Sequence, residues 1–145
     1  MAGSKSNYLE NVVLNHFLKG SATSAPSNVY LGILSAVDTS AETQTEIAPA
    51  SYTATSLGST VVAGRRPEIC FGTVSSGCVF GPTVDIEFEN GSGSAFDVVG
   101  FGIYDCQCTS GSPNLLYYGD ISCKTIEDGD SIRFEATCAI RVSES

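Results

Sequence analysis

Apolar residues follow a helical period near the start of the chain. The first segment at this spacing is 7–19, and its apolar positions are Leu9, Val12, Val13 and Phe17, widened by Leu14 and Leu18. Asn7 suits the N-cap, with Glu10 three residues later, and Gly20 is a typical stop signal. The pattern predicts one short helix over about 7–19 with a buried apolar face. His16 falls off the main stripe, so a solvated or capping role is expected for it.

After this helix the spacing changes to that of β-strands separated by turn residues. The apolar segment 28–34 predicts a well-buried strand. Further strands are expected at 52–57, 59–63, 68–73, 83–89, 98–105, 115–122 and 131–142. The polar stretch 35–51 predicts an exposed loop. A surface loop without a specific contact is slightly favoured over a loop that reaches a neighbouring subunit.

Strict alternation is clearest in two of these strands. In the first, Val84, Ile86 and Phe88 are expected to face opposite to Asp85, Glu87 and Glu89. The last strand is expected to have one long inner row: Ile132, Phe134, Ala136, Cys138, Ile140 and Val142. This parity predicts that Cys138 lies in the core with Cys123 beside it. Asp128-Gly-Asp130 predicts the tight turn before the last strand.

Together these patterns predict a mainly β protein with a single domain over residues 1–145. Short strands with turns at this spacing favour an antiparallel sandwich or barrel, jelly-roll-like, with the N-terminal helix packed over one face or opening. The chain has no heptad repeat, which argues against a long coiled-coil shaft built from this chain alone.

The charge balance narrows the expected partners. The formal net charge is −9, from 16 acidic and 7 basic side chains, so a nucleic-acid partner is not expected. Arg65-Arg66 is the only adjacent basic pair, and local ion pairs are its expected role. No apolar run approaches the length of about 18 residues that a membrane span needs, and residues 1–7 are polar and lack the apolar core of a secretory signal. The chain is therefore expected to be made and retained in the cytoplasm, without a membrane partner.

Cysteine is abundant for a cytoplasmic chain. The six cysteines are Cys70, Cys78, Cys106, Cys108, Cys123 and Cys138. Their spacing contains no Cys-x-x-Cys pair, so a zinc site is weakly supported, and no metal or other cofactor is expected. Free thiols are the default in a reducing cytoplasm, and disulfides within or between subunits are the alternative after exposure to oxidising conditions.

No catalytic motif stands out in the chain. It lacks a Gly-x-Ser-x-Gly, a phosphate-binding loop and a His-Glu-x-x-His. Glu87 and Glu89 share one strand face, but no loop has the oxygen density of a calcium site. A cysteine paired with His16 is the remaining catalytic alternative. The expectation is therefore that the protein is not an enzyme and has no catalytic residue.

Three segments carry a resemblance to a known family: Asn7-Tyr-Leu-Glu-Asn-Val-Val-Leu-Asn-His16, Val29-Tyr-Leu-Gly-Ile-Leu34, and Phe101-Gly-Ile-Tyr-Asp105 with Asn114-Leu-Leu-Tyr-Tyr-Gly119. In this order they resemble small virion structural proteins of tailed bacteriophages, often labelled tail-fibre-like. The last pair predicts the two arms of a β-hairpin. Its tip, 106–113, is longer than the family's usual turn and carries two thiols, so a family binding surface is not transferred to this tip.

The resemblance implies a non-enzymatic virion protein, assembled in the host cytoplasm. The leading expectation is an accessory or decoration protein that docks on capsid, neck or tail subunits and on copies of itself. In this interpretation Leu9, Val13 and Phe17 pack against Ile103 and Leu115 of the hairpin. One alternative is a tail-fibre or tail-tip protein that binds a host surface receptor, with the outward ring of Tyr117-Tyr118 stacking on a sugar or pressing against a subunit. A small enzyme with a cysteine nucleophile is a third, weaker alternative.

Overall fold

The structure, a computed structural model, describes residues 2–22, 24–38, 44–56, 60–107, 113–136 and 139–143. Its elements, in chain order, are β1 (Ala2–Lys5), α1 (Asn7–Lys19), β2 (Val29–Ala36), β3 (Thr45–Glu46), η1 (Pro49–Ser51), β4 (Tyr52–Ser56), β5 (Thr60–Ala63), β6 (Glu68–Ile69), β7 (Cys78–Gly81), β8 (Ile86–Asn90), β9 (Phe96–Tyr104), β10 (Leu115–Ile126), β11 (Ser131–Phe134) and β12 (Ile140–Ser143). The protein is mainly β with one α-helix, as the sequence predicts.

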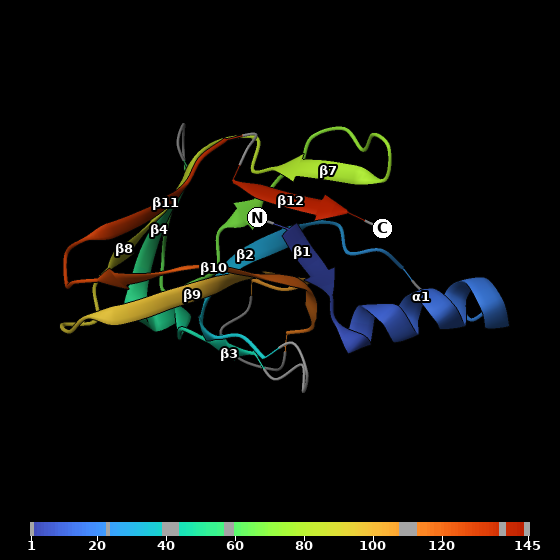
Figure 1. The fold of residues 1–145 in the computed structure, drawn as a ribbon, viewed down its shortest axis with the longest axis horizontal. Helices are drawn as coiled ribbons and strands as arrows, with labels where there is room; N and C mark the ends of the chain where they lie inside the picture. Colours follow the sequence, from blue (N-terminus) through green and yellow to red (C-terminus); the bar gives the residue numbers. More distant parts are fainter. Residues whose placement is uncertain are drawn as a thin grey trace.

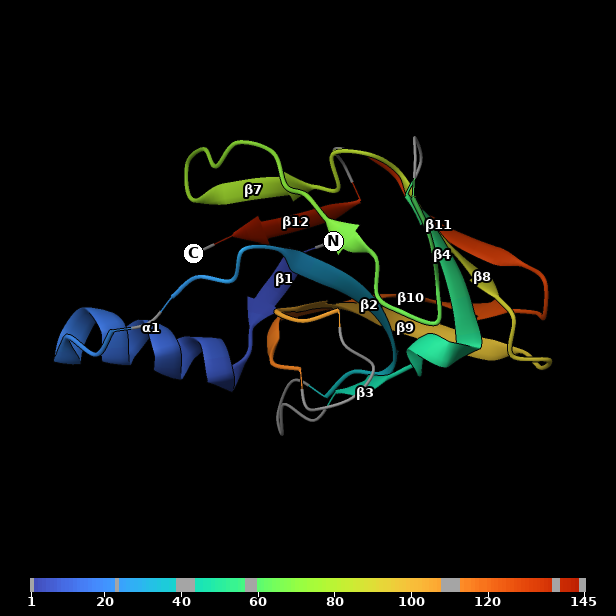
Figure 2. The ribbon, with the colours of Figure 1, turned by 180° about the vertical axis from the view of Figure 1, so that it is seen from behind.

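The strands form two sheets. The larger has eight strands in the order β3-β2-β9-β10-β1-β12-β7, with β6 also paired to β2, and the smaller has the order β11-β8-β4-β5. All pairings are antiparallel except the parallel pair β1–β12. The sheets are arranged like a sandwich, and in the part of the chain described they form no closed barrel. The smaller sheet lies at one end of the molecule, and α1 projects from the opposite end (Figures 1 and 2).

A single apolar cluster joins the two sheets. Leu31 and Ile33 of β2 and Phe101 of β9 are fully buried in it, beside Ile86 and Phe88 of the smaller sheet. The ring of Phe88 meets neighbouring aromatic rings edge to face, at centroid distances of 4.9 and 5.8 Å. Burial of such rings is the main source of stability in a body of this size.

The hairpin of β9 and β10 forms the centre of the larger sheet, as the sequence predicts. Tyr104 pairs with Leu115, and the Asp105 carboxylate accepts hydrogen bonds from the backbone and side-chain nitrogens of Asn114, at 2.9 and 2.8 Å. Gly100 leaves no room for a side chain, because a Cβ atom there would lie 2.5 Å from the carbonyl oxygen of Gly119. The glycine at position 100 therefore allows the backbones of β9 and β10 to approach each other closely.

The long final strand predicted over 131–142 is wrong. The chain forms β11, which pairs with β8 in the smaller sheet, and then β12, which pairs with β7 and β1 in the larger one. The buried parity is retained within each piece, since Ile132, Phe134, Ile140 and Val142 are all buried. Alternation alone cannot reveal that a chain changes sheets between two such pieces. The predicted turn at 128–130 is present, with Gly129 at φ 87°.

The prediction that Cys123 lies in the core is also wrong. Cys123 is exposed, and so is most of the chain around it in the second half of β10. The pairing of β10 with β9 shifts register between Asp120 and Lys124. Four residues of β10 span two residues of β9 there, so β10 bulges around Cys123, and the side chains of the bulge leave the regular pairing on which the prediction depended. Cys138 lies outside the described residues.

Several other boundaries differ from those predicted. The stretch 35–51 is not wholly exposed: Glu46 pairs with Leu34, and Ile47 is buried in the core. The strand expected at 68–73 ends at Ile69, and the strand expected from residue 83 begins at Ile86, which leaves Val84 exposed. The short strands β1 and β7 are not predicted by the sequence pattern, because two to four residues carry too little periodicity.

Candidate functional site

Ser6 connects α1 to the body. It is buried, and its hydroxyl accepts a hydrogen bond from the backbone N–H of Leu9 at 3.2 Å, so Ser6 is the N-cap. Its backbone N–H donates to the carbonyl of Leu116 at 2.8 Å, and its hydroxyl donates to the carbonyl of Leu115. The prediction of Asn7 as the cap is wrong, because Asn7 already has helical geometry. The predicted bounds and the stop at Gly20, with φ 67°, are confirmed.

The predicted burial of α1 against the sheet is wrong. No residue of the helix is buried, and the helix extends away from the body beyond its first turns (Figures 1 and 2). Phe17, expected against Ile103 and Leu115, is 75% exposed. The helix leaves the sheet at a fixed angle, because Ser6 holds its first turn on β10 while no element of the described chain covers its far end.

The far half of α1 carries an exposed apolar surface, here called the distal patch, which consists of Leu14, Phe17 and Leu18. These side chains are 53%, 75% and 77% exposed. Their spacing of three and four residues places them on one side of the helix. Leu18 and Phe17 are the most exposed large hydrophobic side chains among the described residues, and exposed apolar patches are typical of interaction sites.

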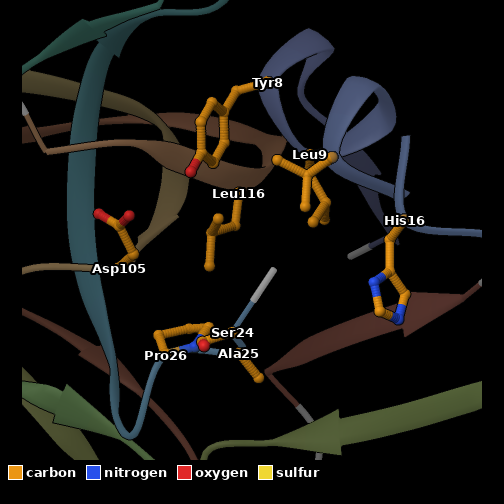
Figure 3. Close-up of a pocket in the computed structure, with 9 residues that line it drawn as sticks. Tyr8, Leu9, His16, Ser24, Ala25, Pro26, Asp105 and Leu116 are labelled. Atoms are coloured by element: carbon orange, nitrogen blue, oxygen red, sulfur yellow. The ribbon is translucent and has the colours of Figure 1, made fainter. Parts of the chain in front are cut away.

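A cavity of about 520 Å³ lies between the base of α1 and the segment that returns from it. Tyr8, Leu9 and His16 line it from the helix, while the segment 24–26 and Leu116 line it from the other side (Figure 3). The cavity forms because α1 projects outward and the chain after Gly20 runs back alongside it to β2. Its lining is mixed and it opens to solvent.

Of the titratable side chains that line this cavity, His16 and Asp105 already have partners. His16 Nδ1 lies 3.2 Å from the carbonyl oxygen of Ser21, and the Asp105 carboxylate is bound by Asn114. His16 and Asp105 come from opposite walls (Figure 3). The structure brings none of the described cysteines into this cavity, so the predicted alternative of a cysteine paired with His16 gains no support here.

A second, more apolar cavity of about 230 Å³, here called the apolar hollow, lies beside the first. Its floor consists of Ile103, Leu116 and Val142, which are almost fully buried. Its rim includes Phe71, Val74 and Tyr117, of which Val74 is 69% exposed. Leu116 lines both cavities, so the apolar hollow adjoins the base of α1. The sequence pattern did not indicate this hollow, because its residues come from five separate segments.

Tyr117 and Tyr118 face opposite sides of β10, as the sequence predicts. Tyr118 is buried, whereas Tyr117 is half-buried at the rim of the apolar hollow. Tyr117 therefore lies in an apolar setting, and this position favours packing contacts over the stacking of a sugar in a polar site.

Arg66 is the centre of a buried polar cluster. Its guanidinium binds both carboxylate oxygens of Glu46 at 2.6 Å and lies 4.6 Å from the ring centre of Tyr104. Burial and the nearby Glu46 carboxylate raise the pKa of Tyr104 above its ordinary value. Gly32 makes room for the cluster, since a Cβ atom there would lie 2.6 Å from Glu46. The predicted ion-pair role is confirmed for Arg66, and the cluster ties β3 to β9.

The cysteines fall into different environments. Cys70 and Cys123 are exposed and free, and Cys78 is free and half-buried, with its sulfur 3.1 Å from a guanidinium nitrogen of Arg141. Burial and the neighbouring Glu68 raise the pKa of the Cys70 thiol. Cys106 is disulfide-bonded. Cys108, like Cys138, lies outside the described residues, so the pairing of the thiols stays a prediction.

In the described part of the chain, no group of three or more His, Cys, Asp or Glu side chains is arranged to hold a metal ion. The described residues also contain no helix with the length and apolar character of a membrane span.

The structure is thus a β-sandwich-like body from which one helix with an exposed apolar patch projects. The chain matches the model of the family described as podophage GP4 fiber I protein gp80 over residues 4–141, and it therefore belongs to this family. This membership supports a structural role in a bacteriophage virion, as the resemblance implies. No curated protein matches the chain.

Proposed function

We propose that the protein is a non-enzymatic structural subunit that docks on neighbouring virion proteins through α1 and so strengthens the phage particle. The observation that carries the proposal is the distal patch, which projects from the body on a capped helix. An amphipathic helix that presents anchors at positions i, i+3 and i+4 is the usual form of a helix that enters an apolar groove.

The support of α1 fits a docking role. Ser6 fixes the base of the helix to β10 through two backbone carbonyls and caps its first turn. A helix held at its base loses little further freedom on binding, so more of the contact energy remains for affinity. The body behind it is a rigid scaffold, because its core joins both sheets.

The polar groups support a structural role over catalysis. His16 and Asp105, the imidazole and the carboxylate of the larger cavity, are bound to Ser21 and Asn114 and lie on opposite walls. A nucleophile with a base and an orienting group within hydrogen-bond reach is the minimum for covalent catalysis. The described residues that line this cavity do not include such a set.

The family description as a fibre protein favours a position on an appendage of the particle, at the neck or tail, over decoration of the capsid shell. The contact that one helix makes with a neighbouring subunit is small in area. Copies arranged around a symmetric neck or tail bind several sites at once, and such multivalent contact raises the overall affinity. The distal tail tip, with binding of a host receptor, is the competing position.

Incorporation into particles tests this proposal. Particles are assembled with wild-type protein, with Phe17→Gln/Leu18→Gln, or with the control Val84→Gln, which changes an exposed apolar residue away from α1. Mass spectrometry of purified particles should show at least about a tenfold loss for the helix variant and wild-type amounts for the control. Undiminished incorporation of a folded helix variant overturns the proposal. Antibody labelling then distinguishes neck, tail and tail tip.

A further inference from the structure

We propose that the partner of α1 is a second copy of this chain, and that two copies exchange helices so that the distal patch of each enters the apolar hollow of the other. This inference rests on the proposed function, because it names the subunit that α1 contacts. Three observations carry it: the position of the hollow, the match between two apolar surfaces and the distribution of charge.

The first observation is that the hollow lies at the base of the helix. Leu116 lines the hollow and also the cavity beneath α1. At a rise of about 1.5 Å per residue, the 13 residues of α1 span about 20 Å. Two such helices placed antiparallel about a two-fold axis bring the end of each to the base of the other. The distal patch therefore reaches the neighbouring hollow without any rearrangement of the body.

The second observation is the match between two apolar surfaces of one chain. The distal patch offers one aromatic and two aliphatic side chains, and the hollow is lined almost entirely by apolar residues such as Phe71, Val74 and Ile103. The volume of about 230 Å³ is of the size that one or two large side chains fill. Phe17 is the natural occupant, with Leu14 and Leu18 against the rim.

The area of the contact selects the reciprocal arrangement. The exposed parts of the distal patch amount to about two large side chains, or about 300 Å². One helix in one hollow is therefore well below the value of about 800 Å² per partner in a specific interface. In the reciprocal arrangement each copy buries its distal patch and its hollow together, and the flanks of the two helices add further area. The reciprocal arrangement therefore buries more surface in each copy than one helix in one hollow does.

The third observation is charge. The chain carries a net charge of −9, yet residues 11–19 contain no acidic side chain and end in Lys19. The hollow adjoins a cavity lined by Glu68, with Val29 and Phe71 shared between the two. The end of α1 thus approaches another copy of this acidic protein with little repulsion, and Glu68 of the adjoining cavity offers a carboxylate to Lys19.

Sedimentation velocity of the purified chain tests the inference over a range of concentrations. The wild type, of 15.1 kDa per chain, should form a dimer. Phe17→Gln/Leu18→Gln on the helix and Val74→Asp on the rim should each weaken dimerisation by about 30-fold or more, although the two sites lie apart in one chain. Val84→Asp, on an exposed apolar residue outside both surfaces, should leave the dimer intact. Circular dichroism confirms that each variant is folded.

The outcomes separate this inference from the proposed function. A wild type that stays monomeric overturns the exchange, and so does a dimer that Val74→Asp leaves unchanged. In both cases, loss of the helix variant from particles still supports docking of α1 on a different virion protein. Conversely, a dimer that both variants disrupt supports the exchange even where the helix variant is incorporated normally and the proposed function fails.

Discussion

Phe101 in β9 and Phe17 in α1 occupy opposite environments in the same molecule. Phe101 is fully buried, whereas Phe17 is 75% exposed. Both belong to apolar segments, Phe101 to a predicted strand and Phe17 to a predicted helix, and Phe17 is expected to pack against Ile103 and Leu115 of the hairpin. Periodicity identifies which face of an element is apolar, but it does not identify whether the surface that covers this face belongs to the same chain.

The difference separates folding from assembly. The body gains its stability from a core shared by the two sheets, and α1 adds no buried residue to it. The free energy of burying the distal patch is therefore available to a contact between subunits, at about 1.5–3 kcal/mol for each fully buried side chain. We infer that the helix can be altered without loss of the fold, which makes the two regions experimentally separable.

The largest expected difference in stability is that between truncation of Phe101 in the core and truncation of Phe17 on α1. Phe101→Ala should lower the free energy of unfolding by about 3–5 kcal/mol, because it leaves a cavity in the core. At concentrations where the chain is monomeric, Phe17→Ala should change it by no more than about 0.5 kcal/mol, since the ring is then in solvent and alanine favours the helix. Urea unfolding of the purified variants measures both. Equal losses would mean that α1 packs on the body in solution, and the comparison would fail.

A second test removes the positive charge of Arg66 from the buried cluster. Arg66→Met should lower the free energy of unfolding by about 3 kcal/mol, because it leaves the Glu46 carboxylate without its partner in a largely buried setting. The adjacent Arg65 is exposed, so Arg65→Met is a matched control with an expected change within about 0.5 kcal/mol. Thermal and urea unfolding measure the pair. A similar loss in both variants would show that the cluster contributes nothing specific to the body.

The parts that the sequence predicts well depend on local signals. The helix ends within the predicted bounds because Gly20 stops it, and the β9–β10 hairpin forms between two apolar arms that Asp105 and Asn114 close. The general class, mainly β with one helix, follows from the change of period along the chain. These features need no knowledge of distant neighbours.

The predictions that are wrong concern features that depend on pairing between distant segments of the chain. The switch between sheets after β11 and the register shift near Lys124 are set by which strands become neighbours, and residue types alone do not report this. The candidate site shows the same division. The apolar residues of α1 are evident in the sequence, but their exposure is not, and the apolar hollow combines loop and strand residues as distant as Phe71 and Val142.

The smallest expected change in the free energy of unfolding comes from removing the hydroxyl of a tyrosine, Tyr52 in the body, with Tyr8 on α1 as its counterpart. The Tyr52 hydroxyl is buried without a hydrogen-bond partner among the described residues, and burial, followed by the nearby Glu46, raises the pKa of Tyr52 above its ordinary value. Tyr52→Phe should therefore be neutral or stabilising by up to about 1 kcal/mol at pH 7.

The same substitution has a defined dependence on pH. The unfolded chain ionises this tyrosine near pH 10 while the folded chain keeps it protonated, so the wild type loses stability as the pH rises above about 10. The advantage of Tyr52→Phe should then grow by up to about 1.4 kcal/mol per pH unit. Urea unfolding at pH 7, 10 and 11 measures it, with Tyr8→Phe on the exposed helix as the matched control. Equal gains for the two variants would mean that burial of the ring, the feature that distinguishes the body from α1, has no role in the alkaline response.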